Sequence, residues 1–181
     1  MPADPQNPIE RVVLLGFMAA GKTETGAELA RLLGWAHVDL DREIERRAGR
    51  RVAEIFAADG EARFREMEAE ATRETARRSG IVLSPGGGWI TRAENLEALG
   101  AGTLSVWLQV SAEEAVRRAA SRPGERPLLA GPDPLAAARR LLDERAPLYA
   151  RAALHLTTEA RSPAQVAAII EAELRARGGP A

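Results

Sequence analysis

The eight residues from Gly16 to Thr23 constrain the fold of this 181-residue chain more than any other segment. They read Gly-Phe-Met-Ala-Ala-Gly-Lys-Thr and match the phosphate-loop pattern G-x-x-x-x-G-K-[ST]. In shuffled chains of the same composition, such a match arises about once in two thousand. An apolar run over residues 11–16 precedes the motif, and residues 22–33 follow it with helical spacing. This strand-to-helix setting is the one that the motif requires.

The chemistry of such a loop depends on its glycines and on the helix that follows. Backbone N–H groups turn inward around phosphate oxygens, and the helix N-terminus adds partial positive charge. We therefore expect Lys22 to reach the β- and γ-phosphates of a nucleotide and the Thr23 hydroxyl to bind Mg²⁺. The alternative interpretation is an ordinary glycine-containing turn between a strand and a helix.

Lysine usage supports the first interpretation. Lys22 is the only lysine beside 24 arginines, and it stands where a flexible point charge is the usual phosphate ligand. The same count excludes small G proteins, whose guanine-reading motif Asn-Lys-x-Asp needs a second lysine.

Short apolar runs alternate with helical patterns along the chain. The runs predict five strands, over residues 11–16, 35–39, 80–84, 103–110 and 153–157. Helices are predicted over residues 22–33, 42–48, 52–58, 61–78, 92–99, 112–120, 134–148 and 163–177. Ser111 is the expected N-cap of the helix over residues 112–120, and Ser162 that of the helix over residues 163–177. This order predicts an α/β fold with a parallel sheet covered on both faces. Ligands of such sheets bind at the carboxyl ends of the strands.

Composition narrows the class of protein. Hydrophobic residues make up 45% of the chain, enough for the core of a single domain over residues 1–181. The 25 basic and 26 acidic residues nearly balance, which argues against a nucleic-acid partner. The absence of cysteine excludes disulfides and cysteine nucleophiles. We find no membrane span or targeting signal, so we expect a cytoplasmic protein with disordered tails over residues 1–8 and 178–181.

Two acidic residues follow the second predicted strand. Asp39 and Asp41 are two positions apart, which on an extended strand turns both carboxylates to one side. One could then hold Mg²⁺ and the other accept the proton of an attacking hydroxyl. The alternative is that Asp39 or Asp41 only caps the helix that follows.

Several further segments carry candidate ligand-binding residues. Residues 86–88 are three glycines after the third strand, which permit close approach of a ligand or form a tight turn. Arg126 lies in a Pro- and Gly-containing loop over residues 122–132, as expected of a lid. Arg65 and Arg145 lie on predicted helices, where a solvated surface charge is the alternative; for Arg65 the expected partner is Glu61.

Taken together, these segments resemble the shikimate kinase family of the P-loop, nucleoside-monophosphate-kinase-like group. The resemblance runs from Val12 to Leu174, through GFMAAGKT, DLD, the Arg-Phe-Arg segment, GGG, ERPLLAG and ERAPLY in the family's order. It implies a P-loop NTPase-type, three-layer α/β/α fold with strand order 2-3-1-4-5. Residues 41–79 would form the acceptor-binding segment and residues 122–132 the lid.

The resemblance also implies roles for individual residues. Asp41, Lys22 and Arg126 would be catalytic, and Thr23 and Asp39 would hold Mg²⁺. ATP would be bound by Gly16, Ala19, Ala20, Gly21, Lys22, Thr23, Glu24, Arg118, Arg126 and Arg161. Shikimate would be bound by Asp41, Arg65, Gly86, Gly87, Gly88 and Arg145. The implied reaction is phosphorylation of the 3-hydroxyl of shikimate by a cytoplasmic monomer, in aromatic amino acid biosynthesis.

Three residues depart from the family pattern. Ala19 stands where glycine is usual, and alanine suits this position if its backbone φ stays negative. Glu24 replaces a small hydroxyl residue and would weaken nucleotide binding unless it points outward. Trp89 follows the glycines where a small residue is common, and it either packs in the core or reshapes the acceptor pocket. These departures leave open a kinase for gluconate or a nucleoside monophosphate, and a nucleotide-binding module without catalysis.

Overall fold

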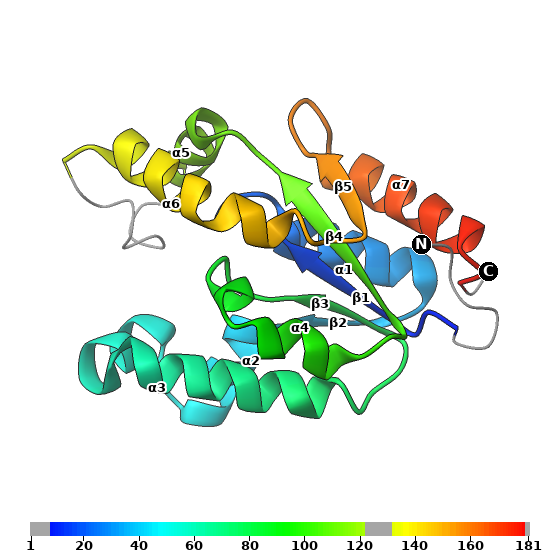
Figure 1. The fold of residues 1–181 in the computed structure, drawn as a ribbon, viewed down its shortest axis with the longest axis horizontal. Helices are drawn as coiled ribbons and strands as arrows, with labels where there is room; N and C mark the ends of the chain where they lie inside the picture. Colours follow the sequence, from blue (N-terminus) through cyan, green and yellow to red (C-terminus); the bar gives the residue numbers. More distant parts are fainter. Residues whose placement is uncertain (1–7, 122–131, 180–181) are drawn as a thin grey trace.

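A parallel sheet of five strands organises the fold (Figure 1). The computed structural model describes residues 8–121 and 132–179. Its strands are β1 (Arg11–Leu15), β2 (Ala36–Asp39), β3 (Ile81–Ser84), β4 (Thr103–Gln109) and β5 (Leu154–Thr157). They lie in the order β2-β3-β1-β4-β5 and every pairing is parallel. The predicted sheet and its strand order are confirmed.

Helices cover both faces of this sheet. They are α1 (Lys22–Leu33), α2 (Leu40–Ala48), α3 (Val52–Thr75), α4 (Ala93–Leu99), α5 (Ala112–Ala120), α6 (Pro134–Tyr149), α7 (Pro163–Ala176) and a short 3₁₀ helix, η1 (Trp89–Thr91). Helices α1 and α7 pack together on one face, and α2, α3 and α4 lie on the other (Figure 1). The predicted three-layer α/β/α architecture is therefore confirmed.

The central strand β1 contributes to both halves of the core. Val12 and Leu14 join an apolar cluster with residues of α1 and α7. Val13 and Leu15 join a second cluster with residues of α2, α3 and α4. All four side chains are at most 2% exposed. This burial on both faces explains why β1 is an unbroken apolar run and not an alternating one.

The predicted boundaries differ most from the structure around α2 and α3. Helix α2 begins at Leu40 and not at residue 42, because Asp39 ends β2 and caps the helix at once, accepting from the Arg42 N–H at 3.2 Å. The helices predicted over residues 52–58 and 61–78 form the single element α3, which is kinked at Gly60. Gly60 has φ 80° and ψ 170°, a conformation that glycine adopts without a Cβ clash.

Both predicted serine N-caps are present. Ser111 and Ser162 accept hydrogen bonds from the backbone N–H groups of Glu114 and Gln165, each at 3.2 Å. Each bond satisfies a donor that the first turn of a helix would otherwise leave without a partner.

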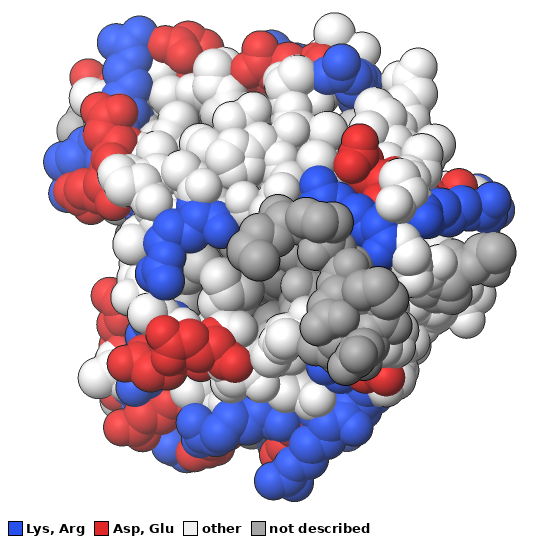
Figure 2. All heavy atoms as spheres, turned by 45° about the vertical axis from the view of Figure 1, so that its right-hand side comes forward, with Lys and Arg blue, Asp and Glu red and all other residues white. Residues whose placement is uncertain are grey.

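Charged side chains of both signs are interspersed on the surface drawn in Figure 2. Several form ion pairs along one helix, such as Arg46 with Glu43 at 2.8 Å and Arg175 with Glu171 at 2.7 Å. Within residues 8–121 and 132–179, no helix has the length and apolar character needed to cross a membrane.

Candidate active site

A cavity of about 630 Å³ opens at the carboxyl ends of the strands. Its wall includes Asp39 at the end of β2, Ser84 at the end of β3 and Thr158 directly after β5. The cavity brings together most of the predicted site residues: Ala19, Ala20, Gly21, Lys22, Thr23, Glu24, Asp39, Asp41, Gly86, Gly87, Arg118 and Arg161. Gly16, Arg65, Gly88 and Arg145 do not line it, and Arg126 lies outside the described residues.

The phosphate loop has the backbone conformation that its motif predicts. Gly16 has φ 143°, and a Cβ atom there would lie 2.5 Å from the Leu108 carbonyl oxygen, so only glycine fits. Gly21 has φ 88° and precedes α1. Within the loop, the Lys22 ammonium group donates to the carbonyls of Gly16 and Phe17, each at 2.9 Å. The ammonium group therefore lies over the loop, where bound phosphates would meet it.

Ala19 does not meet the condition under which alanine suits this position of the loop. Its φ is 58°, in the left-handed region that alanine adopts only at a cost. The peptide that joins Ala19 to Ala20 is hydrogen-bonded at both of its polar atoms. The Ala20 N–H donates to the Phe17 carbonyl at 3.2 Å, and the Ala19 carbonyl accepts from Arg118 at 3.2 Å. Alanine therefore takes the backbone shape that glycine usually provides, with neighbouring groups holding it there.

The start of α1 is anchored on the neighbouring strand ends. The Ser84 hydroxyl donates to the Lys22 carbonyl at 3.0 Å, and His37 Nε2 lies 3.0 Å from the same hydroxyl oxygen. Gly26 leaves room for both groups, because a Cβ atom there would lie 2.5 Å from the Ser84 hydroxyl oxygen. The sequence offered no motif for this contact, which fixes the helix that carries Lys22 and Thr23.

Thr23 and Asp39, the residues predicted to hold magnesium, are in direct contact. The Thr23 hydroxyl donates to Asp39 Oδ2 at 2.9 Å, while Asp39 Oδ1 caps α2. Asp39 therefore caps α2, as one interpretation expected, and its other carboxylate oxygen contacts Thr23. One hydroxyl and one carboxylate suit Mg²⁺, which binds proteins through few oxygen ligands and completes its shell with water and phosphate.

Asp41 reaches the cavity by a different route from the one predicted. Because β2 ends at Asp39, Asp41 lies in the first turn of α2 and not on an extended strand. Its Oδ1 atom is buried and has no hydrogen-bond partner among the residues that the structure describes. Burial raises the pKa of this carboxyl group to about 6, and the nearby charge of Asp39 adds to the effect. Such a group is poised to accept a proton near neutral pH.

Neighbouring groups lie so close to the three glycines that a larger residue would crowd them. A Cβ atom on Gly86 would lie 3.1 Å from Asp41 Oδ1, and one on Gly88 would lie 2.3 Å from Arg65 Nη2. A Cβ atom on Gly87 would lie 3.3 Å from the Met18 backbone nitrogen, in the phosphate loop. This segment therefore has glycine because it passes between the phosphate loop and the charged groups of α2 and α3.

Arg65 is a partly buried residue and not a solvated one. It pairs with Glu61 at 2.8 Å, as predicted, but also with Glu68 at 2.5 Å, and its side chain is only 15% exposed. Glu68 is fully buried, and burial raises its pKa to about 7 although Arg65 opposes the rise. Glu68 was not among the residues predicted for the site. The available signal was a glutamate in register with the apolar residues Phe64 and Ala71 on one helical face.

Tyr149 joins the glycine segment to the second predicted arginine. Its hydroxyl donates to the Gly87 carbonyl at 2.5 Å. Burial raises the pKa of Tyr149 to about 12, and the nearby charges of Arg145 and Arg65 oppose that rise. Arg65 and Arg145, which come from α3 and α6, therefore lie close to the same phenol group beside Gly87.

The open question about Trp89 is resolved in favour of core packing. The side chain is 0% exposed, and its Nε1–H donates to the Thr72 hydroxyl at 2.8 Å. The indole belongs to the apolar cluster on the α2, α3 and α4 side of the sheet. It therefore does not reshape the cavity, whose lining residues do not include it.

This fold and site define a phosphate-loop kinase: a parallel sheet in the order 2-3-1-4-5, a phosphate loop after its first strand, and a carboxylate in the same cavity. The family model described as "Shikimate kinase" matches residues 18–175. The chain belongs to the shikimate kinase family.

Individual relatives agree with this assignment. A shikimate kinase of Symbiobacterium thermophilum is 44% identical over 169 residues, covering 92% of this chain and 97% of the relative. One from Thermus thermophilus is 46% identical over 160 residues, covering 88% and 86%. The solved structure of the Acinetobacter baumannii shikimate kinase in complex with shikimate has a TM-score of 0.88 at 35% identity, covering 96% of this chain and 98% of that one.

Proposed function

We propose that this chain transfers the γ-phosphoryl group of ATP to the 3-hydroxyl of shikimate, giving ADP and shikimate 3-phosphate, a step toward chorismate and the aromatic amino acids. The observation that carries the proposal is that the phosphate loop and Asp41 line one cavity. A nucleotide phosphate and an acceptor hydroxyl can therefore meet there. Membership of the shikimate kinase family supports the choice of acceptor.

ATP would bind along the phosphate loop and toward α5 and the start of α7. The loop amides of residues 19–24 would surround the phosphates, with Gly16 shaping the turn and Lys22 placed to neutralise the transferring group. Arg118 and Arg161 line the same cavity at the end near α5 and α7, where the base would lie. We further propose from the family resemblance that Arg126 contributes a positive charge from the loop over residues 122–132.

Thr23 and Asp39 would hold Mg²⁺, which supplies positive charge to the phosphate oxygens when bound. Their contact at 2.9 Å supports this role, because both oxygen atoms are available to one small cation once the hydroxyl turns.

Shikimate carries one carboxylate and three hydroxyl groups, and the second half of the site suits both kinds of group. Arg65 and Arg145 would pair with the carboxylate, since a guanidinium offers two parallel N–H donors. Asp41 Oδ1 and Glu68 Oε1 have no hydrogen-bond partner among the described residues, and both lie within 3.5 Å of a Cβ position built on Gly86. Hydroxyl donors of the acceptor would satisfy these oxygens beside Gly86–Gly88.

Asp41 would act as the general base. A carboxyl group with a pKa of about 6 is mostly ionised at pH 7 yet basic enough to take a hydroxyl proton as the phosphoryl group arrives. Most of the catalytic effect would come from positioning and from charge stabilisation in a closed site. We propose a single cytoplasmic kinase domain that acts as a monomer, with residues 41–79 as its acceptor-binding segment and residues 122–132 as its lid.

An acceptor panel tests this proposal. The full chain would be assayed with MgATP by coupled ADP release, using shikimate, gluconate and nucleoside monophosphates in parallel, and the product mass would be measured. Among these acceptors, we expect only shikimate to give ADP release. Release with gluconate or a nucleotide but not with shikimate would favour a related small-molecule kinase, and ATP binding without release would favour a non-catalytic module.

Two variants of α6 test whether Arg145 binds the carboxylate of shikimate. Arg145→Ala is expected to raise the KM for shikimate, whereas Arg140→Ala removes a side chain that is 69% exposed and paired with Glu144. If both substitutions act alike on that KM, Arg145 does not bind the acceptor.

A further inference from the structure

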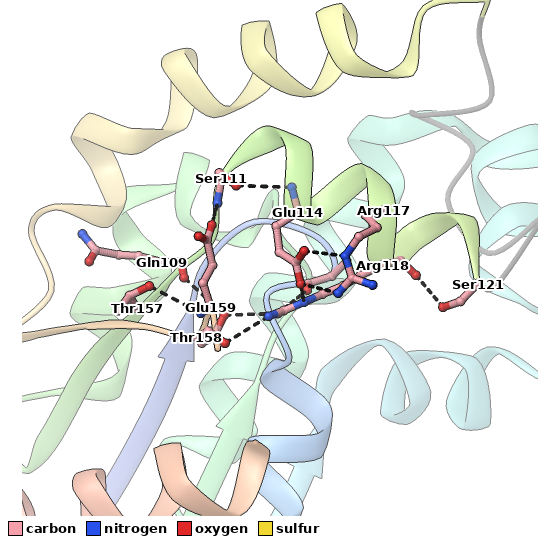
Figure 3. Close-up of polar contacts among 10 residues, drawn as sticks. Gln109, Ser111, Glu114, Arg117, Arg118, Ser121, Thr157, Thr158 and Glu159 are labelled. Atoms are coloured by element: carbon pink, nitrogen blue, oxygen red, sulfur yellow. Dashed lines mark hydrogen bonds and ion pairs between the residues drawn. The ribbon is translucent and has the colours of Figure 1, made fainter. Parts of the chain in front are cut away.

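Arg118 connects three parts of the nucleotide end of the cavity (Figure 3). Its Nη1 donates to the carbonyl of Ala19 in the phosphate loop at 3.2 Å and to the Thr158 hydroxyl at 3.1 Å. Its Nη2 donates to the Thr158 carbonyl at 3.0 Å. The guanidinium therefore joins the last turn of α5 to the phosphate loop and to the segment between β5 and α7.

The Thr158 end of this connection is buried and hydrogen-bonded to the sheet. Thr158 is 3% exposed, and both its backbone N–H and its hydroxyl donate to the Gln109 carbonyl at the end of β4, at 2.9 and 3.2 Å. Glu159 adds a second tie, because its carboxylate accepts from the Ser111 N–H at the start of α5 at 2.8 Å (Figure 3). Arg118 therefore binds a segment that is itself hydrogen-bonded to the end of β4 and the start of α5.

Glu114 sets the direction in which Arg118 points. Its Oε1 accepts from Arg118 Nε at 2.7 Å, one helical turn away, and both side chains are three-quarters or more buried. Hydrogen bonds from Arg117 and Arg118 hold the pKa of Glu114 at about 2, so it stays ionised at neutral pH. With Nε bound to Glu114, both terminal nitrogens face Thr158 (Figure 3). Nη1 also donates to the Ala19 carbonyl.

The Ala19 end of the connection is the part that needs support. Ala19 has φ 58°, and for alanine this conformation persists only where the surroundings hold it. The next peptide unit leads into Gly21 and the start of α1, whose N–H groups would face the phosphates. Relaxation of Ala19 toward negative φ would turn that peptide and misalign those groups.

We propose that Glu114 is a positioning residue for nucleotide binding: it orients Arg118, which holds the Ala19 carbonyl and thereby keeps the phosphate loop in its binding shape. The inference rests on the proposed function, since it requires that the loop binds a nucleotide. It assigns Glu114, which lines the cavity, a role that is exerted through Arg118 and Ala19. It also explains how the loop works with alanine where glycine is usual.

The direction in which Glu114→Ala changes the affinity for MgADP distinguishes a positioning role of Glu114 from an effect of its charge. Glu114→Ala removes a negative charge from the nucleotide end of the cavity, so an effect of charge alone would tighten MgADP binding. Loss of positioning would weaken it, by about tenfold if a charged hydrogen bond is lost. The matched control is Glu113→Ala on the same helical turn, where the carboxylate is 57% exposed and pairs with Arg139.

Calorimetric titration of each full-length variant with MgADP supplies the readout. We expect Glu114→Ala to weaken binding about tenfold and to raise the KM for ATP equally, while the KM for shikimate and kcat at saturating ATP stay within about twofold of wild type. Glu113→Ala should match wild type. Equal affinities in the two variants, or tighter binding by Glu114→Ala, would overturn the inference while leaving the proposed function intact. Failure of the wild-type chain to bind MgADP would overturn both.

A second substitution guards against a merely structural effect of Glu114→Ala. Ala19→Gly provides a residue that adopts positive φ without strain, so the loop should depend less on Arg118. In the Ala19→Gly background, we expect the loss of MgADP affinity caused by Glu114→Ala to fall from about tenfold to about twofold. An unchanged tenfold loss would show that the carboxylate does not act through Ala19.

Discussion

Replacing Asp41 with asparagine is expected to stabilise the fold while it abolishes turnover. Burial and the charge of Asp39 raise the pKa of Asp41 from 3.8 to about 6. The folded protein therefore binds this proton more tightly than the unfolded chain does. Ionisation of Asp41 therefore lowers the free energy of unfolding at neutral pH, and asparagine, which carries no charge, avoids this loss.

The sign and size of the effect follow from the two pKa values. Below pH 3.8 the carboxyl group is protonated in both states, and asparagine is a close isostere. As the pH rises through 6, the wild-type protein loses the stability that the protonated group contributed, whereas the asparagine variant does not titrate. The full difference corresponds to about 3 kcal/mol, and solvent in the cavity reduces it, so we expect a gain of about 1–3 kcal/mol near pH 8.

Urea unfolding of Asp41→Asn and of the wild type at about pH 5 and about pH 8 measures this difference. The gain should be about half as large at the lower pH. Asp143→Asn, at an exposed position of α6, is the control and should follow the wild type. In parallel, kcat should fall by about 10²–10⁴-fold with ATP affinity nearly unchanged. A pH-independent stability difference would refute the buried-charge argument, and turnover at the wild-type rate would remove Asp41 from the mechanism.

Three further substitutions probe other contacts of the site. Lys22→Arg should lower kcat/KM by about 10²-fold or more, because a planar guanidinium cannot reproduce the two 2.9 Å contacts of the ammonium group; near-normal steady-state rates would contradict this. Gly88→Ala places a Cβ atom 2.3 Å from Arg65 Nη2, so it should raise the KM for shikimate about tenfold but not that for ATP, and equal changes in both would argue against a local effect. Thr72→Val removes the acceptor of the buried Trp89 Nε1–H and should lower the free energy of unfolding by about 1–3 kcal/mol with both KM values unchanged. Thr75→Val removes a hydroxyl that donates to the Ala71 carbonyl, and it should lower the free energy of unfolding by less.

The sheet could be predicted because its signals are local. Each strand is a short apolar run with a helix after it, and the phosphate loop identifies β1 and α1 together. The strand order came only from resemblance to a family, since no residue in an isolated strand specifies its neighbour. The boundary differences at Leu40 and Gly60 arose where a cap and a glycine each allow more than one local structure.

The candidate site was less predictable where it depends on distant residues. Asp41 was expected in the cavity and lines it, but through the first turn of a helix and not through strand geometry. Glu68 was missed because a buried glutamate is recognisable only when its partner Arg65 is seen to be buried too. The contacts of Tyr149 with Gly87 join residues 62 positions apart, so no spacing rule reveals them.

Ala19 shows why a departure from a motif is weak evidence against function. Alanine suits this position of the motif if its φ is negative, yet the φ of Ala19 is 58°. Alanine lacks the conformational freedom of glycine, but two hydrogen bonds hold the peptide between Ala19 and Ala20. Arg118 donates to its carbonyl oxygen, and its N–H donates to the Phe17 carbonyl. A strained residue persists where its surroundings over-determine its conformation. The motif glycine and the supporting arginine are therefore two solutions to one backbone requirement, and a chain that loses the first becomes more dependent on the second.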